Sequence, residues 1–230
     1  MSRPDFAHVD IAPLGVGDLQ FLIDNFPQPA RTHSDIARVI HHMPTTVESM
    51  LDSRFVVEAL LESRELVLRV SPFLWFNVLL RRALPTHRTR LDRQAINYLA
   101  NLLSLFVDAR RVQRVQPDDT HAYTYLWELV AAAEQADESR RFLVYSHIGN
   151  YSLYLSGMFN DWLEHRYRFG RRPLNINYYI DFGRTYFDRA ADHRMAREFQ
   201  LEDVFGYLAA AFDDFRRGLM RLARRDWAFG

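Results

Sequence analysis

The sequence predicts an all-α protein, a multi-helix bundle of about seven to nine helices around one central apolar helix near residues 142–165. Three observations predict this class: apolar residues recur at helical spacing along most of the chain, capping residues precede several of these runs, and alternating, strand-like runs are few. The best strand candidate, ELVLRV at 65–70, is short and isolated. We therefore expect a single all-α domain over residues 1–230, with residues 1–62 as a candidate smaller N-terminal helical subdomain.

The composition indicates a globular protein with no net charge and no cysteine chemistry. Hydrophobic residues make up 48% and charged residues 25% of the chain, which is typical of a globular protein. The formal net charge is zero, so no overall positive field would attract nucleic acid or an anionic bilayer. The absence of cysteine excludes disulfides, thiolate metal sites and a cysteine nucleophile. The first residues lack the apolar core of a signal peptide, and we expect a cytoplasmic protein.

Two helix starts are predicted in the first half of the chain. The tetrapeptide TTVE at 45–48 has the pattern of a capping box, with Thr45 as the cap and Glu48 bonding back to it. Ser71 followed by Pro72 is typical of a helix that has a serine cap and proline at its first position. Each start precedes an apolar run at helical spacing, and Pro85 is expected to end the second run.

Further runs at helical spacing follow at 92–106 and 123–130. The most regular run lies at 201–222, where apolar residues form one face and charged residues the opposite face, as in an amphipathic surface helix. Asp213 and Arg217 are four residues apart on that helix, so we expect them to pair across its surface.

The predicted central helix begins with nineteen side chains, 142–160, that carry no formal charge except a conditional one on His147. This run approaches the length that a membrane span requires. It also contains eight polar or small residues, which argue against a helix that faces lipid, so we expect no membrane association. Beside its apolar face lies a strip of small side chains: Gly149, Ser152, Ser156 and Asn160. Such a strip would let a neighbouring backbone come close.

The third quarter of the chain is rich in aromatic residues, since residues 145–187 contain twelve of the chain's 32. Buried tyrosine hydroxyls need hydrogen-bond partners. The region therefore predicts a core with a polar network, a homodimer interface or a pocket for a small ligand, and the sequence leaves these three open. The candidate ligand-binding residues are His147, Asn150, Tyr151, Tyr178 and Tyr179.

No catalytic motif is found. His147 and Tyr151 could present an imidazole and a phenol to one cavity for acid–base chemistry, but a hydrogen-bonded core histidine explains the same pattern. The chain has no His-Glu-x-x-His, no phosphate-binding glycine loop, no Gly-x-Ser-x-Gly and none of the Glu-x-x-His motifs of helical di-iron sites. We expect no cofactor and no metal. The protein is predicted to be non-catalytic, with a structural or binding role. It could act as a homo-oligomer, or bind a small ligand or another protein.

A different class is suggested by SDIARVIHHMPTTVESML at 34–51, which resembles the helix-turn-helix of bacterial repressors. The candidate DNA contacts are Arg38, Thr45, Thr46 and Arg54. Residues 1–50 carry three basic and six acidic side chains, a balance that opposes phosphate contacts and argues against nucleic acid. A DNA-binding transcriptional regulator is therefore the alternative hypothesis.

Two segments carry a resemblance to known proteins. YSHIGNYSLYLSGMF at 145–159 together with RRDW at 224–227 is similar to a group of uncharacterised bacterial all-helical proteins that have no assigned function. The resemblance covers roughly residues 50–227. It implies a helical fold and no mechanism, and it transfers no functional residue.

Overall fold

The computed structural model describes residues 3–26, 44–62, 70–84, 89–169 and 175–225, and in these ranges all regular secondary structure is helical. The all-α prediction is confirmed. No helix in the described ranges combines the length and apolarity that crossing a membrane requires. The helices in those ranges are α1 (Val16–Asn25), α3 (Pro44–Leu51), α4 (Arg54–Glu62), α5 (Pro72–Ala83), α6 (Arg90–Phe106), α7 (Ala109–Val112), α8 (Leu126–Gln135), α9 (Glu138–Met158), α10 (Asn160–Phe169), α11 (Ile176–Asp192), α12 (Arg194–Glu198), α13 (Glu202–Ala210) and α14 (Phe212–Arg224).

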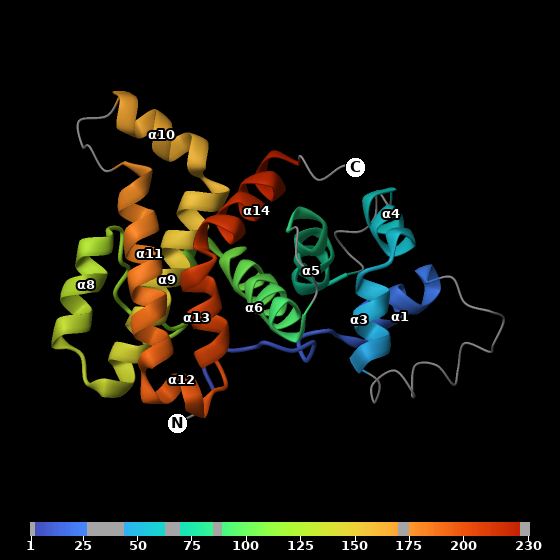
Figure 1. Ribbon diagram of the computed structural model, residues 1–230, viewed down its shortest axis with the longest axis horizontal. Helices are drawn as coiled ribbons and strands as arrows, with labels where there is room; N and C mark the ends of the chain where they lie inside the picture. Colours follow the sequence, from blue (N-terminus) through green and yellow to red (C-terminus); the bar gives the residue numbers. More distant parts are fainter. Residues whose placement is uncertain (1–2, 27–43, 63–69, 85–88, 170–174, 226–230) are drawn as a thin grey trace.

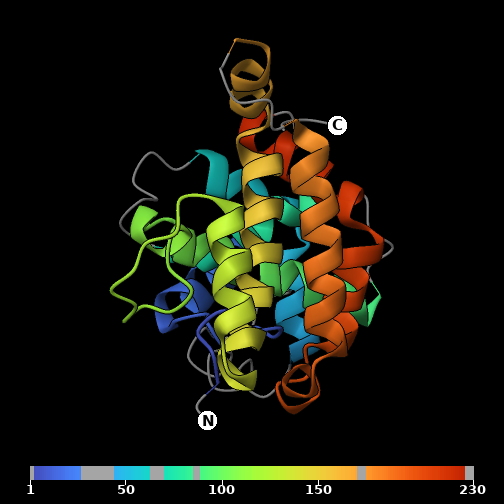
Figure 2. The ribbon, with the colours of Figure 1, turned by 90° about the vertical axis from the view of Figure 1, so that its left-hand side faces the viewer.

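The helices form one elongated bundle (Figure 1). At one end α8, α10, α11, α12 and α14 all contact α9, and at the other end α1 contacts α3 and α4. Helices α5 and α6 pack together between the two ends (Figure 1). Seen from the α8 side, α9 and α11 lie side by side and α10 projects beyond them (Figure 2). The buried apolar side chains form one cluster that extends from Phe6 to Leu222.

Helix α9 is the central apolar helix that the sequence predicts, and it is capped by Asp137, whose side chain accepts a hydrogen bond from the Arg140 amide. The predicted strip of small residues permits close packing at Gly149, and Gly157, which lies outside that strip, permits it as well. A methyl group added at Gly149 would lie 2.7 Å from the Phe187 ring of α11, and one added at Gly157 would lie 2.6 Å from Leu219 of α14. Both neighbours therefore occupy the space that a larger side chain would need.

Two of the predicted helices are each divided by a bend. The expected central helix over 142–165 ends at Met158, because Phe159 adopts φ −120°, ψ 28°, and the chain continues as α10. The amphipathic run 201–222 is divided at Ala211, which adopts φ −101°, ψ 25°. The apolar spacing continues through both bends, so periodicity alone does not detect them. These divisions and the short helices α7 and α12 explain why the described part of the chain has thirteen helices rather than seven to nine.

The predicted cap at Ser71 is confirmed, since its side chain accepts a hydrogen bond from the Leu74 amide at 3.2 Å. The predicted capping box at Thr45 and Glu48 is wrong. Helix α3 already begins at Pro44, and the Glu48 carboxylate binds the Arg81 guanidinium of α5 instead. A partner distant in the sequence has thus displaced the local hydrogen bond. The strand candidate at 65–70 lies outside the described residues except for its last position.

The expected pair of Asp213 and Arg217 is also wrong. Asp213 pairs with Arg184 of α11 at 2.7 Å and with Arg216 at 3.2 Å, while Arg217 pairs with Asp214 at 2.6 Å. Pairs at i,i+3 spacing and a pair with the neighbouring α11 have thus formed in place of the i,i+4 pair. An exposed i,i+4 pair contributes only a few tenths of a kcal/mol, so it is easily replaced.

A buried arginine connects the N-terminal helices to α5 and α6. The Arg81 guanidinium donates to Asn77 Oδ1 at 2.8 Å, to Asp52 Oδ1 at 3.0 Å and to the Glu48 carboxylate. Asn77 in turn donates to Asn97 Oδ1 of α6 at 2.7 Å. Because a buried charge is costly unless it is paired and hydrogen-bonded, this network determines how α3 sits on α5.

We expect Gly183→Ala to destabilise the protein by about 1–3 kcal/mol, since a methyl group at Gly183 would lie 2.3 Å from the fully buried Phe212 ring and 3.1 Å from Ser152. Gly206→Ala is the matched control. No atom lies within 4 Å of a methyl group at that position, so alanine should stabilise α13 by up to about 1 kcal/mol. Urea unfolding measures both changes, and equal effects of the two substitutions would contradict the close packing of α11 against Phe212 of α14 and Ser152 of α9.

Candidate functional site

A cavity of about 280 Å³ lies between α8, α9, α10 and α11, and we call it the aromatic cavity. One side is formed by Tyr151 and Leu155 of α9, Trp162 and Arg166 of α10, and Tyr179 of α11. The bend at Phe159 brings the α10 residues toward those of α9 and α11, because it directs the chain away from the α9 axis. Two of the five predicted ligand-binding residues, Tyr151 and Tyr179, therefore share one cavity.

The other side of the aromatic cavity comes from the chain before and at the start of α8. There the rings of Tyr125 and Trp127 are stacked, with centroids 6.2 Å apart and planes inclined by 13°. Trp127 is 59% exposed and Trp162 is 48% exposed. A second cavity of about 500 Å³ adjoins this one, since both are lined by Tyr151, Leu155, Trp162 and Gln113. Large apolar side chains that gather at an exposed hollow are typical of binding sites.

Tyr151 and Tyr179 are both neutral at physiological pH. The Tyr151 hydroxyl donates to the Thr124 carbonyl at 2.9 Å. Burial, with smaller contributions from Tyr179 and Glu128, raises the pKa of Tyr151 to about 12, against the positive charge of Arg166, which lowers it. Burial also raises the pKa of Tyr179, again against Arg166. The two phenols can therefore form hydrogen bonds but do not supply a negative charge.

His147 lies one helical turn before Tyr151, beneath the cavity wall. Its ring centroid is 6.2 Å from those of Phe106 and Tyr151, both of which line the 500 Å³ cavity. The side chain is buried, and its Nε2 has no hydrogen-bond partner. Burial and, to a smaller extent, the charge of Arg111 lower the pKa of His147 to about 3, against a hydrogen bond with the Val112 backbone. The imidazole is neutral, and it lines neither the aromatic cavity nor the adjoining one.

Asn150 and Tyr178 are placed elsewhere. Asn150 is buried in the core, where its Oδ1 accepts a hydrogen bond from the Tyr98 hydroxyl of α6 at 2.7 Å. Tyr178 packs against Phe182, with ring centroids 4.5 Å apart, and against Tyr179, but it does not line the aromatic cavity. The predicted set of five residues therefore does not form one site.

Three of the predicted DNA-binding residues, Thr45, Thr46 and Arg54, do not line this cavity. Arg38 is outside the described residues, as are the first helix and the turn of the proposed motif. Thr45 and Thr46 belong to α3, and Arg54 is the first residue of α4, with its guanidinium 4.9 Å from the centroid of the Phe55 ring. The helix-turn-helix prediction is therefore not tested.

Sequence analysis missed Trp127, Trp162 and Arg166. Trp162 lies within the range expected for an unbroken central helix, but it follows the bend at Phe159, on α10, where its side chain is 48% exposed. Trp127 lies outside the aromatic-rich region, so the local excess of aromatic residues did not indicate it. Arg166 is one of 29 arginines in the chain. The available signal was the pair of tryptophans itself, because tryptophan is enriched at binding surfaces.

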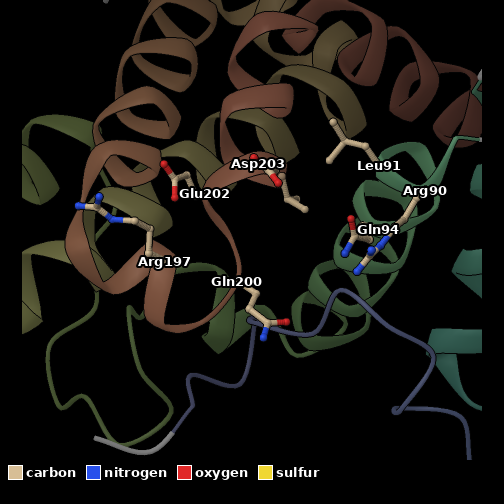
Figure 3. A pocket seen from close by; sticks show the side chains of 8 residues that line it. Arg90, Leu91, Gln94, Arg197, Gln200, Glu202 and Asp203 are labelled. Carbon is tan, nitrogen blue, oxygen red and sulfur yellow. The ribbon is translucent and has the colours of Figure 1, made fainter.

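Two other hollows are polar and carry charges of both signs. Figure 3 shows one of about 460 Å³, with Arg90 and Gln94 of α6 on one wall and Arg197 and Glu202 on the other. Gln200, which adopts a left-handed backbone conformation with φ 60°, lies between these walls (Figure 3). A hollow of about 570 Å³ borders the Arg81 network. In the described part of the chain, no group of three His, Asp or Glu side chains is arranged to hold a metal ion.

The buried His147 should make folding sensitive to acid. Its pKa is about 3 in the folded protein and about 6.5 when unfolded, so below pH 6.5 protons bind preferentially to the unfolded chain. The free energy of unfolding should then fall by about 1.4 kcal/mol per pH unit from this group, or about 2 kcal/mol between pH 6.5 and about pH 5. Stability above pH 6.5 is not affected by this titration.

Urea unfolding at pH 7 and at about pH 5 measures this loss. His147→Asn should remove it, whereas His165→Asn, at an exposed histidine of α10, should retain it. An equal pH dependence in the wild type and the His147 variant would show that another group carries the effect.

Comparisons of this chain with protein-family models, with curated proteins and with solved structures found no match. The candidate site therefore depends on its own geometry: two tryptophans and three tyrosines from α8, α9, α10, α11 and the segment before α8, gathered at one cavity with an arginine at its wall.

Proposed function

We propose that this protein is a non-catalytic binding protein whose aromatic cavity takes a small, planar, largely apolar ligand. The observation that carries the proposal is the convergence of aromatic rings from separate elements: Tyr125, Trp127, Tyr151, Trp162 and Tyr179. Aromatic rings bind planar apolar molecules by offset stacking and edge contacts, which contribute about 0.5–1.5 kcal/mol per pair beyond the burial of area.

The size and the walls of the cavity support a small molecule. Its volume of about 280 Å³ is close to the lower end of the range for ligand sites, and the adjoining 500 Å³ gives room for a substituent. Its walls come from four helices and the segment before α8, an arrangement that surrounds a ligand on several sides. A flat docking surface would be formed by fewer elements.

The polar groups at the cavity favour binding over catalysis. The Tyr151 hydroxyl already donates a hydrogen bond to the Thr124 carbonyl, and the raised pKa of Tyr151 and Tyr179 disfavours their use as bases. His147 is neutral and buried, and it lines neither the aromatic cavity nor the adjoining one. Among the described lining residues there is thus no pair of a nucleophile and a base.

Phenylnaphthylamine, a neutral aromatic dye that fluoresces in apolar surroundings, tests the proposal. The wild-type protein should bind it saturably, at about one dye per chain. Trp162→Ala should weaken this binding by about tenfold, because it removes one wall of the cavity. Tyr167→Ala is the matched control, since Tyr167 is an aromatic residue of α10 with similar exposure, 47%, that does not line the cavity.

Absence of saturable dye binding, or equal effects of the two substitutions, would overturn the proposal. A homodimer that covers the cavity is the competing explanation for its exposed tryptophans. In that case dye binding should weaken as the protein concentration rises, and the dye should dissociate the dimer in sedimentation velocity. Dye affinity that does not depend on protein concentration is the result that the ligand-binding proposal predicts.

A further inference from the structure

Arg166 differs from the arginines that maintain the fold. Arg81, Arg140 and Arg216 each bind a carboxylate from another part of the chain or from their own helix. Arg166 has no carboxylate partner among the residues that the structure describes, and its guanidinium lies 4.7 Å from the centroid of the Trp162 ring. It is therefore a cation that an aromatic wall orients and that no described ion pair neutralises.

The charge of Arg166 acts on the aromatic cavity. Arg166 is one of its lining residues, and its positive charge lowers the pKa of both Tyr151 and Tyr179 on the neighbouring helices. Glu128 is the carboxylate whose charge opposes it at Tyr151. One Glu128 oxygen, however, accepts hydrogen bonds from the Thr124 and Tyr125 amides at 2.8 and 2.9 Å, which engage it at the start of α8.

A guanidinium over an indole ring is suited to a particular class of ligand. The planar guanidinium of arginine binds a carboxylate or sulfonate through two parallel hydrogen bonds. Because Arg166 is stacked on Trp162, its side chain loses less conformational freedom when it binds such a group. The adjacent aromatic walls would contact a planar ring. The same cavity thus offers a cation and an apolar surface side by side.

We propose that the ligand of the aromatic cavity is an aromatic acid, whose ring lies among Tyr151, Trp162 and Tyr179 and whose acidic group pairs with Arg166. This inference rests on the proposed function, because it specifies the chemical class of the ligand for the same cavity. It goes further by assigning Arg166 as the residue that selects acids over neutral compounds of the same shape.

Two dyes with the same skeleton separate the two proposals. Anilinonaphthalene sulfonate carries an acidic group that phenylnaphthylamine lacks. The wild-type protein should bind the sulfonate about tenfold more tightly than the neutral dye, a difference expected for one charge-assisted pair at a partly shielded site. Added salt should reduce the advantage of the sulfonate but leave the affinity for the neutral dye unchanged.

Arg166→Gln should remove the preference for the sulfonate, so that the ratio of the two dye affinities falls from about tenfold to about one. Arg166→Lys should restore only part of the preference, because lysine keeps the charge but not the planar guanidinium. Arg168→Gln is the matched control: it removes the same charge from the same helix at an exposed residue outside the cavity lining, and it should preserve the preference.

The outcomes separate the assigned selectivity from the proposed function. Binding of the neutral dye at the cavity, without a preference for the sulfonate or with one that Arg166→Gln leaves intact, would overturn the acid proposal alone. Equal losses of preference in the Arg166 and Arg168 variants would show that the preference comes from the net charge of α10. That result would also overturn the acid proposal. Failure of both dyes to bind at the cavity would overturn both proposals.

Discussion

The structure depends on the burial of α9 on nearly all sides. A helix in that position must accept neighbours at short distance and must find partners for its polar groups. Gly149 and Gly157 meet the first requirement, because the Phe187 ring and Leu219 occupy the space beside them. Asn150 and Ser146 meet the second through hydrogen bonds with Tyr98 and with the Phe142 carbonyl. The arrangement of α11 and α14 around the bundle follows from this packing.

Two buried polar atoms of α9 lack the hydrogen-bond partner that burial requires. Ser152 Oγ and His147 Nε2 are buried without a hydrogen-bond partner. A buried polar atom left in this state typically costs about 1–3 kcal/mol. For His147 the result is a neutral imidazole whose environment resists protonation. The same burial that organises the bundle therefore prevents the most conspicuous titratable residue of the aromatic region from serving as an acid or a base near pH 7.

The sequence was sufficient for the fold class and for the identity of the central helix, because apolar spacing reports directly which faces are buried. It was not sufficient for the bends at Phe159 and Ala211, since the apolar pattern continues through both. The Glu48 capping box failed for a related reason: its true partner, Arg81, is 33 residues away. The aromatic cavity was only partly accessible to prediction, because Trp127 and Arg166 join it through tertiary packing.

After the bend at Phe159, α10 is packed against the rest of the protein mainly at its start. Its buried residues, Asn160 and Leu163, lie in its first turn. There Arg216 of α14 donates to Asn160 Oδ1 at 3.1 Å, and Arg224 pairs with the adjacent Asp161. Trp162 and Arg166 extend from this anchored base toward the rest of the cavity. Two arginines of α14 thus hold the first turn of the helix that carries Trp162 and Arg166, although no residue of α14 lines the cavity.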